Sequence, residues 1–437
     1  MRGLPPGPRA PVVVNTARFL RRPTETLLGW RRRYGDIFTV KVLLYGVGVY
    51  LCDPEAVREI LTGDQSDLHV ANGPLLPALG EHSILTLDGP EHLRQRKLLM
   101  PPLQGSAIQS FRTVIRDAAR TEVGSWREGE RFVMRERMGR LTFEVIARAV
   151  FGMTAPERIE RLHEAMTALL GAPAVFLMPQ ALRRDLGRWS PWGWFQQRLR
   201  DADALLYEEI AARRCAPDIE DREDVLSLLL RTRDEEGRPM TDAELRDDLI
   251  AMLLAGHETT AIGLAWAFDL LPRNRHVLAR LRDELAAGDD DTYLDAVVTE
   301  TLRMRPILPA GGRVLTKPRT IGGWDLPPGI LVHPAIAILH MREDLFPRAH
   351  EFRPERFIED KAKPYTWLPF GGGIRRCVGA SFAQVEMAEV IRAIVSSVEL
   401  EPARAEPERL VMHGITLVPR HGTPVAVGRI RGFEVAA

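Results

Sequence analysis

The spacing of apolar and polar positions changes along the chain and predicts where helices and strands lie. Residues 24–34 form an amphipathic stretch with helical periodicity. The alternating runs Ile37–Val42 and Val47–Cys52 follow it and predict a hairpin of two β-strands.

The middle of the chain carries apolar positions at helical spacing, for example over 205–213, 242–254 and 276–287. Apolar positions at helical spacing also follow Cys377, the last cysteine of the chain. We therefore predict a helical core over about 90–305 and 379–400.

Short β-like runs occupy 313–334, where Gly322-Gly323 and Pro327-Pro328-Gly329 interrupt them, and a last pair spans Leu410–Val427. With residues 35–55 they predict a small β-rich portion. We find no internal repeat and no linker rich in Gly, Ser and Pro. The predicted fold class is mainly α with small β-sheets, as a single domain over residues 1–437.

Charge and composition favour an enzyme that acts on small molecules. Lys plus Arg equals Asp plus Glu at 59 each, so no global positive charge suggests binding to nucleic acid or to an anionic membrane. The N-terminus lacks the roughly 20 apolar residues of a membrane span. We therefore expect a monomer without a transmembrane anchor.

Three cysteines, Cys52, Cys215 and Cys377, lie far apart in the sequence. An odd and sparse set argues against a disulfide framework and for a reducing compartment, so the expected location is the cytoplasm. Cys52 and Cys215 are best explained as ordinary free cysteines.

Cys377 stands in a glycine-rich loop, Phe370-Gly371-Gly372-Gly373-Ile374-Arg375-Arg376-Cys377-Val378-Gly379, directly before a helical pattern. A thiolate there gains from the positive end of the helix dipole, and the glycines let a flat, bulky ligand approach the backbone. Zinc sites and iron–sulfur clusters need several Cys or His ligands, whereas haem iron takes a single axial thiolate. The alternative is a buried free cysteine beside a glycine-rich turn.

This loop resembles the ligand loop of the cytochrome P-450 superfamily, Phe-x-x-Gly-x-Arg-x-Cys-x-Gly. The matching residues are Phe370, Gly373, Arg375, Cys377 and Gly379. The resemblance covers nearly the whole chain and implies a triangular helical prism that encloses haem b, in a soluble bacterial type of enzyme. It implies that Cys377 binds the iron, Arg375 pairs with a propionate and Phe370 packs by the thiolate. Gly371 and Gly379 belong to the same cofactor-binding loop.

A second motif is the pair Glu300 and Arg303, three apart on one helical face. Alone it would be an ordinary solvated ion pair. The resemblance implies that Arg356 joins the pair in a buried triad. Burial of such charges is costly unless they are mutually paired, so we expect a rigid structural lock and no acid–base role.

A third motif, Ala255-Gly256-His257-Glu258-Thr259-Thr260, interrupts an apolar helical pattern with polar groups. Thr259 could simply bond back to the carbonyl of Ala255, while Gly256 loosens the helix. The resemblance implies instead a notch for dioxygen beside the haem, where Thr259 donates a hydrogen bond and Glu258 relays protons. Their presence favours reductive oxygen activation over the use of peroxide alone.

A fourth site places His92 and Arg96 four apart, on one helical face. The resemblance implies that both bind a haem propionate, and Arg313 is placed to join them. The alternative is a cluster of solvated surface cations, which suits Arg94 and Lys97 better. Those two, with Arg376, are candidate docking residues for an acidic ferredoxin or flavodoxin.

A thiolate-bound haem implies insertion of one oxygen atom into a C–H or C=C bond, with two electrons supplied from outside. The sequence has no Gly-x-Gly-x-x-Gly site and no Cys-rich segment for an internal reductase. We therefore expect NAD(P)H to supply the electrons through a ferredoxin or flavodoxin and its reductase.

Three alternative functions stay open. They are a haem sensor or carrier without turnover, non-oxygenating or peroxide-driven haem-thiolate chemistry, and a colourless binding protein.

Mostly aliphatic residues are candidates for the substrate pocket, and they suggest a lipophilic substrate such as a fatty acid, terpenoid, steroid or macrocycle. Plain core packing is the alternative for each. The candidates are Leu75, Leu79, Phe176, Met252, Ala255, Ile307, Leu308 and Ile415.

Overall fold

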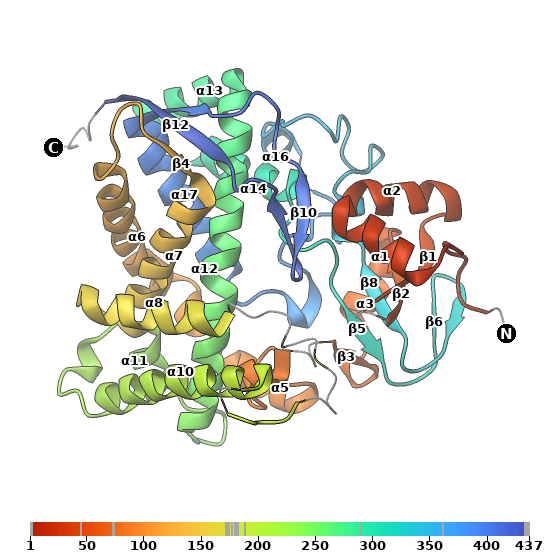
Figure 1. Ribbon diagram of the computed structural model, residues 1–437, viewed down its shortest axis with the longest axis horizontal. Helices are drawn as coiled ribbons and strands as arrows, with labels where there is room; N and C mark the ends of the chain where they lie inside the picture. The colour runs from red at the N-terminus through yellow and green to blue at the C-terminus, as the bar shows by residue number, and fades with distance from the viewer. Residues whose placement is uncertain are drawn as a thin grey trace. The chain divides into compact units, whose positions relative to one another are not determined.

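Helices make up most of the computed structural model, with four small sheets among the described residues (Figure 1). The structure describes residues 3–43, 46–71, 75–170, 175, 178, 183–187, 189–288, 290–360 and 362–431. This architecture confirms the predicted class, mainly α with small β-sheets.

The chain forms two compact units. Unit 1 comprises Met1–Ala71, Ile115–Gly139 and Thr259–Ala437, and unit 2 comprises Asn72–Val114 and Arg140–Glu258. Three helices run through a boundary between the units: α6 (Ser106–Gly124), α7 (Met134–Phe151) and α12 (Asp242–Arg273).

Unit 1 contains a five-stranded sheet of order β1-β2-β8-β5-β3. These strands are β1 (Ile37–Val42), β2 (Gly46–Leu51), β8 (Leu331–Pro334), β5 (Arg313–Leu315) and β3 (Leu68–Val70). Strand β2 pairs with β1 antiparallel and with β8 parallel. The hairpin agrees with the alternating runs in the sequence to within one residue.

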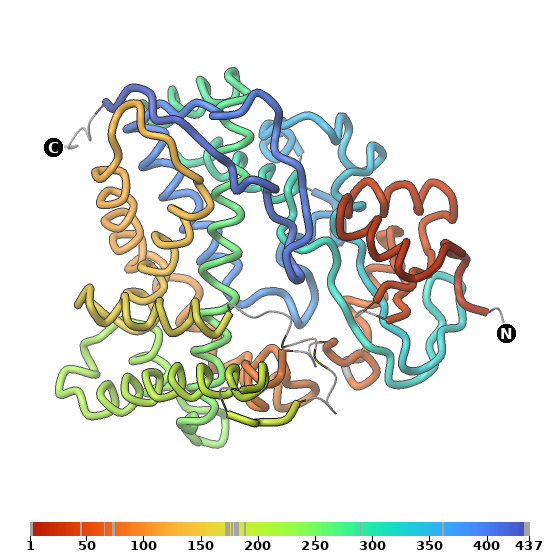
Figure 2. The backbone as a smooth tube through the Cα atoms, in the orientation of Figure 1, coloured from red at the N-terminus to blue at the C-terminus, as the bar shows by residue number. Residues whose placement is uncertain are grey.

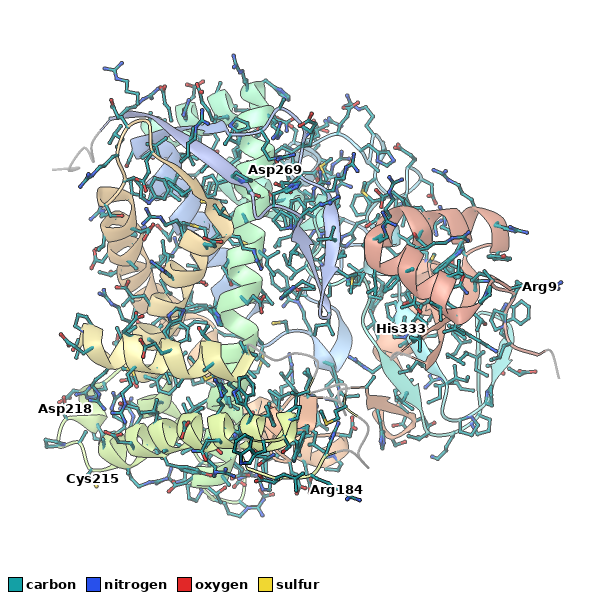
Figure 3. The ribbon with its side chains drawn as sticks, viewed as in Figure 1. Arg9, Arg184, Cys215, Asp218, Asp269 and His333 are labelled. Atoms are coloured by element: carbon teal, nitrogen blue, oxygen red, sulfur yellow. The ribbon has the colours of Figure 1, made fainter. Side chains whose placement is uncertain are left out.

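Two N-terminal helices, α1 (Val12–Arg21) and α2 (Pro23–Tyr34), lie over the hairpin β1–β2 (Figures 1 and 2). Phe19, Leu27 and Trp30 from these helices pack against Phe38 and Val40 of β1. His333 of β8 stacks on Tyr50 of β2, with ring centroids 4.9 Å apart (Figure 3). Burial lowers the pKa of His333 to about 4, so the ring is neutral at pH 7.

The remaining elements of unit 1 include three smaller sheets: β4-β12-β9, β10-β11 and β6-β7. Their strands are β4 (Arg131–Val133), β6 (Arg319–Ile321), β7 (Trp324–Leu326), β9 (Val398–Pro402), β10 (Leu410–His413), β11 (Thr416–Pro419) and β12 (Pro424–Ile430). The helices are α3 (Pro54–Thr62), η1 (Gln65–Asp67), α13 (Arg275–Ala287), α14 (Thr292–Met304), α15 (Ile336–Leu339), α16 (Arg356–Glu359), η6 (Gly373–Arg375) and α17 (Ala380–Ser397).

Unit 2 is helical in the part that the structure describes. Its helices are α4 (Leu76–Leu79), α5 (Gly89–Leu99), η3 (Pro101–Leu103), α8 (Pro156–Leu170), α10 (Pro191–Arg214), η5 (Ile219–Asp221) and α11 (Val225–Arg231). α8 and α10 lie side by side (Figure 1). The α10 helix begins where Ser190 accepts a hydrogen bond from Gly193 N–H at 3.0 Å, with Pro191 in its first turn.

Helix α12 is the one described helix that is long and apolar enough to cross a membrane, judged by length and composition. Most of its apolar window is buried inside the fold. Packing therefore accounts for the apolar character of α12.

Candidate functional site

The cysteine loop lies in unit 1, between η6 and α17. Cys377 stands two residues before Gly379, the N-cap of α17, and its side chain is exposed. Its backbone N–H donates to the carbonyl of Phe370 at 2.9 Å, and Gly371 N–H donates to Leu368 at 3.0 Å. The loop therefore holds a thiol at the positive end of an 18-residue helix.

Gly373 is the residue of this loop that no other amino acid can replace without a shift of the backbone. Its φ is +64°, and a Cβ atom there would lie 1.8 Å from the carbonyl oxygen of Leu61. Gly371 has a similar φ of +66°, but its Cβ would meet nothing within 4 Å. The close approach of α3 thus fixes the identity of Gly373, whereas backbone conformation alone favours glycine at Gly371.

Glu300, Arg303 and Arg356 are in direct contact in unit 1. Arg303 Nε donates to Glu300 Oε2 at 2.6 Å, and Arg356 Nε donates to Glu300 Oε1 at 3.0 Å. The side chains of Glu300 and Arg303 are fully buried, and that of Arg356 is 8% exposed. Arg303 also donates to the carbonyls of His340 and Ala349, at 2.6 and 2.8 Å. Every buried charge is paired, as a structural lock requires.

A row of aromatic rings connects this triad with the cysteine loop. Trp367 lies between Phe357 and Phe370, with ring centroids 6.2 and 6.1 Å away. Its indole N–H donates to the carbonyl of Thr299 in α14, next to Glu300. Trp367 thus contacts both α14 and Phe370, and the carbonyl of Phe370 accepts the hydrogen bond from Cys377.

The third motif lies within α12, where Glu258 ends the unit 2 part and Thr259 begins the unit 1 part. Both side chains are half-buried, and Ala255 is exposed, although the helix is buried from Thr260 to Leu271. In unit 2 the Thr142 hydroxyl donates to the carbonyl of His257 at 2.9 Å. The helix is therefore less deeply buried at residues 254–259 than from Thr260 to Leu271.

Gly256 has a packing role that its sequence did not reveal. A Cβ atom at this position would lie 2.5 Å from Ile146 Cδ1 of α7. The glycine therefore avoids a close contact with the end of the Ile146 side chain within unit 2, a packing reason that the alternative of a loosened helix did not include.

Glu386 is a buried acid that sequence reasoning missed. It lies on α17 in unit 1 with no exposed surface, and desolvation raises the pKa of its carboxyl to about 8. The Thr260 hydroxyl lies beside it and partly lowers the pKa. The available signal was a glutamate flanked in the sequence by the apolar residues Val385 and Met387, within a predicted helix.

His92 and Arg96 lie on α5 in unit 2, His92 buried and Arg96 half-buried. Arg313 is half-buried at the start of β5 in unit 1 and donates to the carbonyl of Gly312 at 2.8 Å. Arg375 is also half-buried, in η6. The four residues that the sequence predicts to bind haem propionates therefore lie two in each unit.

The geometry weakens Arg94 and Lys97 as docking residues. Arg94 pairs with Asp234 at 2.7 Å and with Glu244 at 2.6 Å, and Lys97 pairs with Glu235 at 2.7 Å. Nearby carboxylates offset both charges, which leaves less attraction for an acidic partner. Of the three docking candidates, Arg376 is the exposed side chain in the cysteine loop.

Asp248 of α12 is a second buried acid that the sequence did not reveal. It accepts a hydrogen bond from Ile84 N–H at 2.8 Å and one from the Gln95 side chain of α5. Desolvation raises the pKa of its carboxyl to about 7. Asp248 thus joins α12 to the helix that carries His92 and Arg96, within unit 2.

The candidate pocket residues differ in burial. Leu79 is 1% exposed and Ile307 8% exposed, which fits core packing, whereas Leu75, Met252 and Leu308 are half-buried. Ile415 is 50% exposed at the tip of the β10–β11 hairpin. Phe176 lies outside the described residues.

The donor set in unit 1 fits haem. An exposed thiol stands at a helix N-terminus, and glycine residues around it leave the backbone accessible. No group of three or more His, Cys, Asp or Glu suited to a metal ion occurs among the described residues, so Cys377 is not part of a polydentate cluster there. A lone thiolate matches the single axial ligand of haem iron.

A family model described as cytochrome P450 matches residues 4–424. The chain belongs to the cytochrome P450 family. Cytochrome P450 135B1 of Mycobacterium tuberculosis is 41% identical over 100% of this chain and 93% of its own length. Cytochrome P450 135A1 of the same organism is 38% identical, over 96% of this chain and 94% of its own length. The names of these two relatives give their family and do not state which reaction they catalyse.

Solved P450 structures share the fold. Cyanobacterial CYP120A1 with bound retinoic acid has a TM-score of 0.83 and 25% identity, over 98% of this chain and 99% of that one. The haem domain of cytochrome P450DA has a TM-score of 0.86 and 21% identity, over 99% of both chains. Membership of the P450 family makes the protein a haem-dependent monooxygenase in general terms, and confirms the resemblance of the sequence.

Proposed function

We propose that this P450 uses O2 and two electrons from separate redox proteins to hydroxylate or epoxidise a lipophilic small molecule. The observation that carries the proposal is the exposed thiol of Cys377, held by Phe370 at the N-terminus of α17. Haem with an axial thiolate supplies, when bound, the chemistry that inserts one oxygen atom into the substrate and releases the other as water.

The resemblance to the family supplies the haem b ligands of this proposal. The Cys377 thiolate would bind the iron, and Phe370, Gly371 and Gly379 would shape the loop around it. Arg375, Arg313, His92 and Arg96 donate hydrogen bonds to the propionates, because charge-assisted bonds from Arg to carboxylate are strong and directional.

Glu258 and Thr259 move protons in this proposal. The Thr259 hydroxyl would donate a hydrogen bond and pass its proton along it, and the Glu258 carboxyl would replace that proton with one taken from solvent. Their partly exposed positions on α12 support this role, because a relay needs access to water at one end.

The proposed substrate is lipophilic, such as a fatty acid, terpenoid, steroid or macrocycle. The half-buried or exposed residues Leu75, Met252, Ala255, Leu308 and Ile415 are the best pocket candidates, because a fully buried side chain has little surface for a ligand. The related CYP120A1 carries retinoic acid, an apolar chain with a carboxylate, which supports this class.

Electrons come from NAD(P)H through a ferredoxin or flavodoxin and its reductase, and the protein works as a cytoplasmic monomer. The exposed Arg376 in the cysteine loop is the remaining candidate for contact with an acidic partner.

Turnover under 18O2 tests the proposal. The haem-loaded protein, a surrogate ferredoxin and its reductase are incubated with NADPH and a panel of fatty acids, terpenoids and steroids, after a screen for substrate-induced spectral shifts. We expect a product with one 18O atom, and Thr259→Ala to divert electrons to hydrogen peroxide. Product formation with peroxide but never with the reductase system would instead favour peroxide-driven chemistry.

A further inference from the structure

A cationic cavity on unit 1 lies away from the cysteine loop. It has a volume of about 330 Å³ and lies at the end of α1, the start of α2 and the base of the β10–β11 hairpin. Its lining residues are Arg21, Arg22, Glu25, Arg409, Leu410, Val411 and Arg420.

Four arginines and a single acidic residue, Glu25, line this cavity. All four arginines are exposed, and none of them makes an ion pair with a described acidic side chain. Some exposed arginines elsewhere are paired, as Arg58 is with Glu55 and Arg214 with Asp242, whereas the unpaired ones in this cavity are gathered at one place. The cavity therefore concentrates positive charge that the described part of the protein does not balance.

Two further features bear on the charge of the cavity. Glu25, the one lining carboxylate among the described residues, also interacts electrostatically with Arg305, whose guanidinium lies over Trp266 at 5.2 Å from the ring centroid. The α2 helix begins at Pro23, and the partial positive charge of its N-terminus is offset by the C-terminal carbonyl groups of α1, which ends at Arg21. The excess positive charge of the cavity therefore comes from the arginine side chains.

The walls of the cavity are held by one core cluster. Met412 of β10 packs against the cluster that contains Phe19 of α1 and Leu27 and Trp30 of α2. Packing therefore fixes the backbone positions from which these arginines extend, although their exposed side chains are ordered only when a ligand binds.

We propose that this cavity binds a phosphate-bearing anion. Guanidinium groups bind phosphate oxygens in bidentate pairs, and four of them around one cavity suit a group with two negative charges. The volume exceeds the needs of a bare phosphate, and Leu410 and Val411 give an apolar wall for an organic part. The phosphate belongs either to a soluble phosphate ester or to a phospholipid headgroup, for which Leu20, exposed beside Arg21, offers an apolar contact.

Two probes distinguish these sources. Inorganic pyrophosphate is titrated into the full, haem-loaded chain by calorimetry at about 0.15 M ionic strength, where weak surface attraction is screened. In parallel, the protein is sedimented with vesicles of phosphatidylglycerol in phosphatidylcholine and with vesicles of phosphatidylcholine alone.

Paired variants show whether the cavity is responsible. Arg409→Gln/Arg420→Gln and Arg21→Gln/Arg22→Gln remove opposite walls, and Arg131→Gln/Arg429→Gln removes two exposed arginines outside the cavity. Melting temperature and haem content check that each variant folds. We expect each cavity pair to weaken binding about tenfold or more, and the control pair to leave it unchanged.

If the cavity pairs weaken saturable binding of pyrophosphate and no vesicles are bound, the ligand is a soluble phosphate ester. If the protein sediments with phosphatidylglycerol vesicles through the cavity and does not bind pyrophosphate, the ligand is a lipid headgroup. If both probes bind through the cavity, the phosphate group itself is what the cavity recognises. The proposal would be overturned if neither probe binds, or if the control pair loses as much binding as the cavity pairs. The haem spectrum reports on the proposed oxygenase function separately.

Discussion

Glu386 illustrates a carboxyl group whose chemistry is set by burial. The pKa of its carboxyl is about 8 in the folded protein and near 4.5 in the unfolded chain. Between pH 4.5 and pH 8 the folded protein therefore keeps this proton, whereas the unfolded chain has released it. Stability contributed by the neutral group is therefore complete below about pH 4.5 and is lost as pH rises toward 8.

Replacing Glu386 by Gln should remove this pH dependence. We expect Glu386→Gln to be more stable than the parent near pH 8, by an amount of the order of a few kcal/mol, and similar to it near pH 5. Urea unfolding at both pH values measures the difference. Glu401→Gln, at an exposed position in β9, is the control. Equal pH dependence in parent and Glu386→Gln would contradict the assignment.

Sequence reasoning selected Cys377 and its neighbours because the loop pattern is local, and their roles toward haem stay predictions. It found the triad because the resemblance supplied the pairing of Arg356 with Glu300. It missed Glu386 and Asp248, because their burial depends on neighbours from distant segments: Thr260 for the first, Ile84 and Gln95 for the second. A single sequence does not reveal such pairings.

At the scale of elements, the approach of α3 to the cysteine loop predicts unequal roles for two glycines. Gly371→Ala should cost about 1–2 kcal/mol, the penalty for a side chain in the left-handed region. Gly373→Ala carries the same penalty and also places a Cβ against the Leu61 carbonyl, so it should lose most of its haem. Haem content per protein, from the Soret absorbance, compares them; equal retention would contradict this account.

The triad connects α14 with the segment before the cysteine loop, so its loss should destabilise the fold. Glu300→Gln leaves Arg303 and Arg356 buried without a carboxylate, and we expect a loss of about 3–5 kcal/mol in the free energy of unfolding. The matched control Glu351→Gln breaks an exposed pair with Arg348 and should cost under about 1 kcal/mol. Urea titration of both variants measures their free energies of unfolding. Similar losses of stability in Glu300→Gln and Glu351→Gln would argue against a structural lock.

Element boundaries were predicted best for a long helix with a regular apolar pattern and for strands that pair with the next strand in the sequence. The hairpin of residues 37–51 and the helix after Cys377 agree closely with the sequence pattern. The three-residue strand β3 was not predicted, because its partner β5 lies far along the chain. The division into two units also crosses α6, α7 and α12, and no composition change in the sequence marks those points.

At the scale of the whole molecule, the proposed function predicts that electrons come from separate redox proteins. The sequence has no Gly-x-Gly-x-x-Gly nucleotide site, so NADPH alone should not reduce the haem. We expect NADPH oxidation to begin only when a ferredoxin or flavodoxin and its reductase are added. Stopped-flow absorbance under carbon monoxide follows the reduction, and rapid reduction by NADPH without added proteins would contradict this expectation.

The central claim is that Cys377 is the axial ligand of a bound haem. The direct test is the absorption spectrum of the purified protein after reduction with dithionite and exposure to carbon monoxide, beside Cys377→Ser and a Cys215→Ser control. Cys215 is exposed at the end of α10, outside the loop (Figure 3). We expect a strongly red-shifted Soret band in the parent and the control, and its loss in Cys377→Ser. No haem in the parent, or a histidine-type band that Cys377→Ser leaves unchanged, would contradict the claim.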